Sequence, residues 1–188
     1  MKKNLFSFLF LSAAISVSAA DFPLISNVYG RDYISLNGKW NYVIDPLENG
    51  YYDYRLQPLK NGFFANEKPA TPSDLVEYDL DKAPIMDIPG DWNTRDNRLF
   101  FYEGTVWFKR DFTVKKTAGK RYVIYFGSVN YDAKVYVNGK KVGEHIGGYT
   151  PFNFDVTEVL KDGANFVVVK ADNKRHKDNV PTVNMDWW

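Results

Sequence analysis

The sequence predicts an all-β fold, an antiparallel β-sandwich or jelly roll. Aromatic side chains make up 17% of the 188 residues, a content that favours strands over helices. Short apolar runs recur along the chain between Asn-Gly, Pro-Gly and similar turn signals, which is typical of antiparallel sandwiches. The 45% hydrophobic content is sufficient for one ordinary globular domain.

The first predicted strands lie between residues 36 and 88. Leu36–Asp45 is entered through the Asn37-Gly38 turn, and its second half is typical of a strand. Residues 46–83 contain four prolines and predict loops and short helices. Ile85–Ile88 predicts a short strand that Pro89-Gly90 ends.

From residue 104 onward the pattern is strongly β. Thr105–Val114 predicts a strand that Arg110 interrupts and that has four apolar residues on one face, namely Val106, Phe108, Phe112 and Val114. Tyr122–Phe126 is an almost continuous apolar run, so we expect a strand covered on both faces.

A hairpin and a last buried strand follow. Lys134–Val137 and Lys140–Val142 flank Asn138-Gly139, and this dipeptide suits a type I′ turn because both central residues need a positive φ. Asp155–Leu160 predicts a single helical turn, and Ala164–Ala171 predicts a buried strand.

The N-terminus has the features of a secretory signal peptide. Lys2 and Lys3 precede the apolar run Leu5–Val17, and Ser18-Ala19-Ala20 supplies the small residues of a cleavage site. A transmembrane anchor is the weaker alternative, since the run is shorter than the ~20 residues that span a bilayer. We therefore expect a signal peptide over residues 1–20, and a periplasmic or extracellular protein with no membrane attachment after cleavage.

The rest of the chain divides into an N-terminal arm, residues 21–35, and the sandwich domain, residues 36–188. The sequence stops on Asn184–Trp188, with two indoles and no turn or polar tail. An apolar sheet edge of that kind favours aggregation, so we expect a sandwich that is incomplete at its C-terminus and lacks its last strands. The alternative is a genuine end whose two tryptophans pack into the core.

Composition excludes several classes of function. The 24 basic and 23 acidic residues nearly balance, which argues against a nucleic-acid-binding surface. There is no cysteine and only two histidines, so we expect no disulfide, no metal site and no cysteine nucleophile. The glycines of Gly143–Gly148 lack the spacing of a phosphate-binding loop, and no cofactor is implied.

Candidate catalytic groups are few. Glu103, Glu144, His145 and His176 are all best interpreted as loop or surface residues, and no spacing nominates the paired carboxyl groups of a glycosidase. Asp186 differs because Trp187 and Trp188 follow it. A carboxylate beside aromatic rings can accept hydrogen bonds from sugar hydroxyls while the rings stack on the sugar, so Asp186 is the candidate substrate-binding residue.

Five stretches resemble the N-terminal sugar-binding domain of glycoside hydrolase family 2, in matching order and spacing. They are Asn37–Trp40, Ile88–Asn93, Tyr102–Arg110, Ala133–Lys140 and Gly147–Thr157. The Gly-Gly-Tyr-Thr-Pro-Phe part of the last stretch looks most like β-glucuronidases, while β-galactosidases share much of the pattern.

The resemblance implies a jelly roll like a galactose-binding domain, normally followed by an immunoglobulin-like domain and a (β/α)8 barrel. It implies that both catalytic glutamates belong to the barrel, so this chain alone is expected to be inactive. Asp186-Trp187-Trp188 is similar to the start of an Asp-aromatic-aromatic-Asn-Tyr stretch whose aspartate contacts the terminal sugar.

The leading hypothesis is therefore the sugar-binding domain of an exported retaining exo-β-glycosidase, similar to β-glucuronidases. Its partners would be a carbohydrate substrate and the immunoglobulin-like and barrel domains, and a homo-oligomer is compatible with the sequence. The alternatives are a β-galactosidase of the same family, a stand-alone carbohydrate-binding module, and an inert structural domain.

Overall fold

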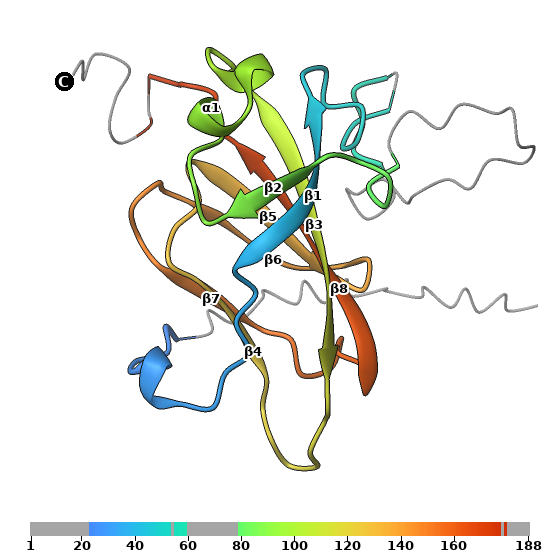
Figure 1. Ribbon diagram of the computed structural model, residues 1–188, viewed down its shortest axis with the longest axis vertical. Helices are drawn as coiled ribbons and strands as arrows, with labels where there is room; N and C mark the ends of the chain where they lie inside the picture. Colours follow the sequence, from blue (N-terminus) through green and yellow to red (C-terminus); the bar gives the residue numbers. More distant parts are fainter. Residues whose placement is uncertain (1–22, 54, 60–78, 178, 180–188) are drawn as a thin grey trace, which may run out of the picture.

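The computed structural model describes residues 23–53, 55–59, 79–177 and 179. These residues form two antiparallel sheets. The larger sheet has the strand order β2-β1-β3-β8-β5-β6 and the smaller one pairs β4 with β7 (Figure 1). The strands are β1 (Gly38–Asp45), β2 (Ile85–Ile88), β3 (Thr105–Val114), β4 (Val123–Phe126), β5 (Asp132–Val137), β6 (Lys140–Ile146), β7 (Phe152–Asp155) and β8 (Gly163–Asp172). The predicted all-β sandwich is thus confirmed.

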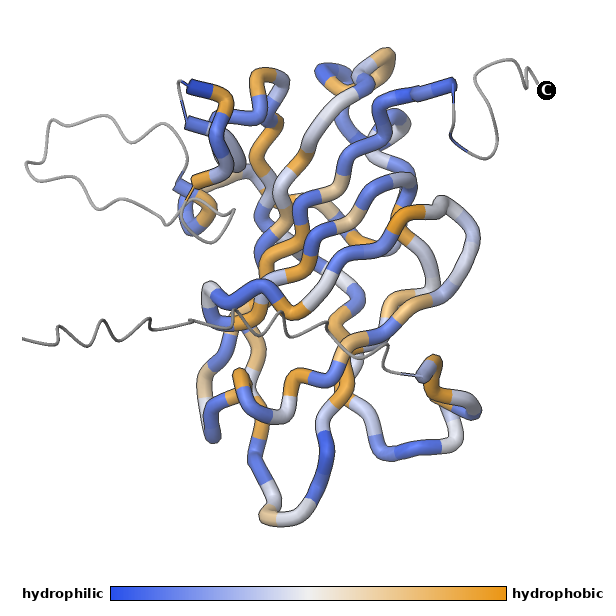
Figure 2. The backbone as a smooth tube through the Cα atoms, turned by 180° about the vertical axis from the view of Figure 1, so that it is seen from behind, coloured by the Kyte–Doolittle hydropathy of each residue, from blue (hydrophilic) through white to orange (hydrophobic). Residues whose placement is uncertain are grey.

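The main core lies on the face of the larger sheet that faces β4 and β7. Hydrophobic and polar residues alternate along the strands, as the hydropathy colours in Figure 2 show, because successive side chains point to opposite faces. The four residues predicted for one face of β3 belong to this core, together with others such as Trp40, Val135 and Val167. Arg110 donates a hydrogen bond to the Lys39 carbonyl oxygen (3.0 Å), which accounts for its place in an apolar pattern.

A second, smaller core covers the outer face of the larger sheet. Trp107, Tyr136 and Val168 point to this face and are fully buried together with Leu80. Tyr51 and Leu59 pack against them. The described parts of the segment predicted as loops, 46–53, 55–59 and 79–83, therefore serve to cover the sheet.

Several predicted elements are confirmed at or near their bounds. β2 and β3 begin and end at the predicted residues, and β1, β5 and β8 differ from them by a few residues at most. Asn138 and Gly139 have φ values of 51° and 79°, as the type I′ turn requires. The Leu160 amide donates to the Val156 carbonyl oxygen (3.0 Å), so the predicted helical turn also exists, after Asp155 has ended β7.

The expected covering of Tyr122–Phe126 on both faces is wrong. Only Ile124 is buried in β4, and its neighbours are half-exposed. The reason is that β4 belongs to the thinner layer, and one face of the strand contacts the core. On the other face the N-terminal arm bonds to the buried Asn153, opposite Tyr125, while Val123 and Tyr125 stay half-exposed.

Four elements were not predicted, and one strand is longer than expected. β7 pairs with β4, β6 continues four residues beyond the expected Val142, and α1 (Trp92–Arg95) with the 3₁₀ turn η3 (Asn97–Leu99) follows β2. A further 3₁₀ turn, η1 (Val28–Gly30), lies in the N-terminal arm. Asp91 caps α1 by accepting a hydrogen bond from the Asn93 amide (2.9 Å).

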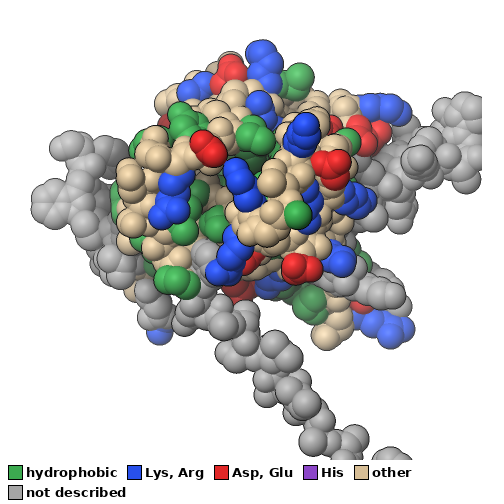
Figure 3. Space-filling view, turned by 90° about the horizontal axis from the view of Figure 1, so that it is seen from below, with side chains coloured by type: hydrophobic (Ala, Val, Ile, Leu, Met, Phe, Trp, Pro, Cys, Tyr) green, Lys and Arg blue, Asp and Glu red, His purple; other side chains and the backbone are tan. Residues whose placement is uncertain are grey.

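The predicted signal peptide and the predictions that concern Asn184–Trp188 fall outside the described residues. Within the part of the chain that is described, no helix is both long and apolar enough to cross a membrane. On the face seen in Figure 3, basic and acidic side chains are interspersed. The expectation that the protein does not bind nucleic acid remains a prediction.

Candidate functional site

The candidate sugar contact, Asp186, lies outside the described residues, but the structure shows the base of the segment that leads to it. This segment leaves β8 at the end of the sandwich that also carries α1 (Figure 1). At this end of the sheet, Thr105 of β3 lies opposite Asp45 of β1 on one side and opposite Asp172 of β8 on the other. Polar side chains of three neighbouring strands are thereby brought together.

We call this group the strand-end cluster, consisting of Asp45, Glu48, Thr105, Lys170, Asp172 and Lys174. Lys170 is almost fully buried, and its ammonium lies 2.8 Å from Glu48 Oε1 and 3.7 Å from Asp172 Oδ2. Lys174 Nζ lies 3.3 Å from Glu48 Oε2. Two lysines and two carboxylates thus neutralise one another where water is largely excluded, which is the condition for a stable buried charge.

Glu48 is held in its ionised form. Burial alone would raise the pKa of its carboxyl, but the hydrogen bond and charge of Lys170, helped by Lys174, lower that pKa to about 2. The Thr105 hydroxyl lies 3.1 Å from Glu48 Oε1 and also 3.1 Å from Asp172 Oδ2. A carboxyl with such a low pKa cannot donate a proton near neutrality, so Glu48 is unsuited to general acid catalysis.

Asp45 has a structural role in the same cluster. Its carboxylate is fully buried and accepts hydrogen bonds from Trp107 Nε1 (2.9 Å) and from the amides of Asn49 and Gly50 (both 3.0 Å). These bonds fold the chain back after β1 and place Glu48 over Lys170. Three donors thus satisfy the hydrogen-bonding capacity of this buried carboxylate.

Asn173, the first residue after β8, is held by hydrogen bonds to Gly104 and Tyr102. Its Oδ1 accepts from the Gly104 amide (2.8 Å), its own amide donates to the Gly104 carbonyl oxygen (3.2 Å), and its Nδ2 donates to the Tyr102 carbonyl oxygen (3.4 Å). Gly104 has a φ of +154°, and an added Cβ would lie 2.6 Å from the Tyr102 hydroxyl. The close approach therefore requires glycine at position 104.

Glu103, one of the candidate acids, takes part in the same attachment. Its carboxylate forms an ion pair with Arg175, two residues after Asn173. Burial, followed by the charge of Asp45, raises the pKa of the neighbouring Tyr102 to about 12, so this phenol stays neutral and donates to the Thr105 carbonyl oxygen (2.8 Å). The hydrogen bonds of Asn173 and the ion pair of Arg175 thus hold the chain after β8 against residues 102–104.

The other candidate residues lie on separate elements. Glu144 pairs with Lys141 on β6 (2.6 Å), and that hydrogen bond lowers the pKa of its carboxyl. His145 stacks on Phe152, with ring centroids 4.3 Å apart, and burial lowers its pKa. The interpretation of Glu144 as a surface residue agrees with its ion pair. Among the described residues no three His, Cys, Asp or Glu side chains group as metal ligands.

Sequence reasoning missed an exposed aromatic pair near this end. Phe100 and Phe101 meet edge to face, with centroids 4.6 Å apart, and Phe101 keeps 91% of its surface exposed. The Asn93 side chain holds the loop by donating to the carbonyl oxygens of Leu99, Phe100 and Tyr102. The aromatic run itself was the available signal, but its exposure depends on the turn that η3 makes.

Comparison with known proteins adds the family context. Residues 33–188 match the family described as "Glycosyl hydrolases family 2, sugar binding domain". The β-galactosidase of Thermoanaerobacter pseudethanolicus is 32% identical over 160 residues, which cover 81% of this chain and 18% of that protein. The β-glucuronidase of Bacteroides fragilis is 34% identical over 103 residues, which cover 52% of this chain and 15% of that protein.

Solved structures agree with these matches. A β-glucuronidase from an uncultured Clostridium sp. is 29% identical with a TM-score of 0.59, over 86% of this chain and 25% of that one. The chain spans 10 to 19% of the length of the curated relatives that it matches.

Proposed function

Because the chain belongs to glycoside hydrolase family 2, as its sugar-binding domain, we propose that it serves an exported, retaining exo-β-glycosidase of the β-glucuronidase type. The observation that carries the proposal is the family match over residues 33–188 together with the fold shared with β-glucuronidases. Export is supported by the signal-peptide pattern of residues 1–20.

In this proposal the domain binds and orients the sugar, and other parts of the enzyme break the bond. Retaining hydrolysis needs one carboxyl that donates a proton and a second, ~5–5.5 Å away, that attacks the sugar. The carboxylates of the strand-end cluster are committed to lysines, backbone amides and hydroxyls, and Glu48 has a pKa of about 2. They fix the protein scaffold and do not supply that chemistry.

Asp186 is the proposed contact to the terminal sugar. A charge-assisted hydrogen bond from a carboxylate to a sugar hydroxyl orients the ring, and orientation contributes to the transition state as well as to binding. The attachment of Asn173 and Arg175 to residues 103 and 104 supports this role, because it gives the segment that leads to Asp186 a fixed starting point.

A domain exchange tests the proposal. Residues 21–188 would replace the corresponding region of the Bacteroides fragilis β-glucuronidase, and hydrolysis of p-nitrophenyl β-D-glucuronide would be measured with and without Asp186→Ala. We expect an active chimera whose kcat/KM falls about 10- to 100-fold in the variant, the loss of roughly 1.4 to 3 kcal/mol for a charge-assisted hydrogen bond. Unchanged kinetics would remove the role of Asp186. Enzyme-like hydrolysis by the 188-residue chain alone would refute the division of labour.

A β-galactosidase is the second candidate, and the long match to the Thermoanaerobacter enzyme favours it. The same exchange into that enzyme, assayed on p-nitrophenyl β-D-galactoside, compares the two directly. Restoration of the galactosidase but not of the glucuronidase would assign the chain to the second candidate. A stand-alone carbohydrate-binding module would instead show sugar affinity in calorimetry with the 188-residue chain by itself.

A further inference from the structure

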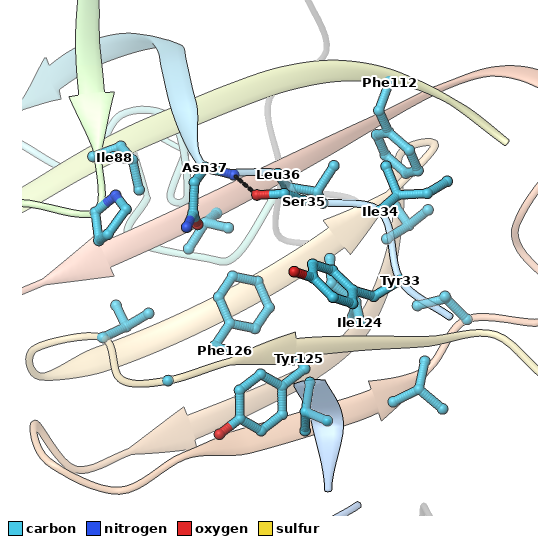
Figure 4. Close-up of a pocket in the computed structure, with 18 of the residues that line it drawn as sticks. Tyr33, Ile34, Ser35, Leu36, Asn37, Ile88, Phe112, Ile124, Tyr125 and Phe126 are labelled. Carbon is cyan, nitrogen blue, oxygen red and sulfur yellow. Dashed lines mark hydrogen bonds between the residues drawn. The ribbon is translucent and has the colours of Figure 1, made fainter. Parts of the chain in front are cut away.

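The fold does not account for the exposure of the aromatic pair Phe100 and Phe101. Phe100 keeps 58% of its surface exposed and Phe101 keeps 91%. Neither ring lines the apolar groove between β4, the larger sheet and the N-terminal arm, where Tyr33 lies in Figure 4. Large apolar side chains that stay in water next to one another mark a binding surface. The pair is therefore a candidate contact for something outside the described chain.

The backbone under the two rings is held in place by described residues. Leu99, directly before the pair, is fully buried. Asn93 Nδ2 donates to the carbonyl oxygens of Phe100 (3.2 Å) and Tyr102 (3.4 Å). The Tyr102 amide donates to the Leu99 carbonyl oxygen (3.0 Å), so both rings lie within one closed turn. Such a backbone presents the rings in a fixed orientation, and preorganisation of this kind favours binding.

The pair also lies beside the start of the segment that leads to Asp186. Phe101 directly precedes Tyr102, whose carbonyl oxygen accepts a hydrogen bond from Asn173 Nδ2 (3.4 Å). Asn173 is the first residue after β8, and the chain leaves β8 at the end of the sandwich that carries α1 (Figure 1). The aromatic pair and the base of the proposed sugar-binding segment therefore belong to the same end of the domain.

The surroundings of the pair favour an uncharged apolar ligand. Arg98 and Glu103 are the nearest charged residues on either side of the pair in the sequence. Arg98 forms an ion pair with Asp96 (2.6 Å), and Glu103 is paired with Arg175. Phenyl rings have no hydrogen-bonding group for the hydroxyls of a sugar, but they stack on other flat rings. The part of a glycoside that matches this chemistry is an aromatic leaving group.

We propose that Phe100 and Phe101 bind the leaving group of the substrate and make the enzyme prefer glycosides whose leaving group is aromatic. The inference rests on the proposed function, since it requires that the domain belong to a glycosidase. It adds the substrate class, namely aryl glycosides. In this scheme Asp186 binds hydroxyls of the terminal sugar, and the two phenyl rings bind the group that departs from it.

Kinetics with two leaving groups test the inference. In the Bacteroides fragilis chimera, kcat/KM would be measured on 4-methylumbelliferyl and on methyl β-D-glucuronide, with and without Phe101→Ala, by the release of glucuronic acid. We expect the aryl-over-methyl ratio of kcat/KM to fall about 10-fold in the variant, because only the aryl group loses a stacking partner. Phe101→Tyr keeps the ring and should keep the ratio. An unchanged ratio in Phe101→Ala would overturn the inference.

Packing of the two rings against another domain of the enzyme is the competing explanation. Phe101→Ala would then lower the unfolding temperature of the chimera and lower kcat/KM equally on both substrates, and the inference would be wrong. Tyr29→Ala is the matched control, because Tyr29 is also exposed and meets Tyr33 edge to face, with centroids 6.2 Å apart. Tyr29 belongs to η1, at the opposite end of the sandwich from α1, so its removal should not change the ratio (Figure 1).

Binding to the 188-residue chain decides the inference independently of catalysis. Saturation-transfer NMR would follow magnetisation from the chain to 4-methylumbelliferyl β-D-glucuronide. We expect transfer to the umbelliferyl protons that is several-fold weaker in Phe101→Ala than in the wild type or Tyr29→Ala. No transfer, or equal transfer in Phe101→Ala and the wild type, would overturn the inference. A chimera that hydrolyses neither glucuronide would count against the proposed function, and the binding of the aryl group would still be decided by this measurement.

Discussion

Removal of the Glu48 charge probes the strand-end cluster in a way that can be worked out from the structure. Glu48→Gln takes away the carboxylate that lies 2.8 Å from the buried Lys170 ammonium. The pKa of Glu48 is about 2 instead of an ordinary 4.5. At 1.36 kcal/mol per pKa unit, this difference stabilises the ionised form in the folded chain by about 3 kcal/mol.

The side chain keeps 21% of its surface in solvent, so part of this energy is screened. We expect Glu48→Gln to lower the free energy of unfolding at pH 7 by about 2 kcal/mol. Because the folded pKa is the lower one, the contribution is complete above pH 4.5 and disappears as the pH falls toward 2. The wild type and the variant should therefore converge in stability over that interval.

Urea unfolding followed by tryptophan fluorescence at pH 7, 4 and 2.5 measures the difference. Glu158→Gln is the matched control, since Glu158 is exposed, and it should change the stability by less than about 0.5 kcal/mol at every pH. If Glu48→Gln has no larger effect than this control at pH 7, or if its effect persists unchanged at pH 2.5, Glu48 does not stabilise Lys170 as we argue.

Two further predictions concern packing and attachment. Gly143→Ala should lower the free energy of unfolding by about 1–3 kcal/mol in urea titrations, because its Cβ would lie 2.1 Å from Cε1 of Phe154, whereas Gly127→Ala, with nothing within 4 Å, should be close to neutral. Asn173→Ala should speed amide exchange at Gly104, which loses its acceptor at 2.8 Å, and should lower kcat/KM in the Bacteroides chimera. Unchanged exchange and kinetics would show that Asn173 does not hold the segment after β8.

Local patterns predicted the elements whose signal lies within their own residues. β3 alternates over ten residues and the Asn138-Gly139 turn requires positive φ, so neither needs information from distant parts of the chain. β7 has four residues after a proline, and it is a strand because it pairs with β4, about 30 residues earlier in the chain. The same reason explains β4, whose apolar run does not reveal that Val123 and Tyr125 on its second face stay half-exposed.

Only the part of the candidate site that belongs to a motif of the family could be predicted from the sequence. Glu48 and Lys170 are 122 positions apart, and Gly104 and Asn173 are 69 apart, so no spacing in the sequence brings them together. Their pairing follows from the strand order β1-β3-β8, which places the ends of three strands side by side. Asp186, by contrast, was nominated from its tryptophan neighbours and the family resemblance, and it stays a prediction.

The charges at the end of the sandwich both order the chain after β8 and decide what the Glu48 carboxyl can do chemically. A catalytic carboxyl needs a pKa near the working pH, but the cluster lowers the pKa of Glu48 to about 2 by surrounding it with lysines. The same interactions hold β8 and the residues after it in one conformation, since Lys170, Asp172 and Lys174 all belong to this stretch. The interactions that hold residues 170–174 therefore also keep Glu48 from proton-transfer chemistry.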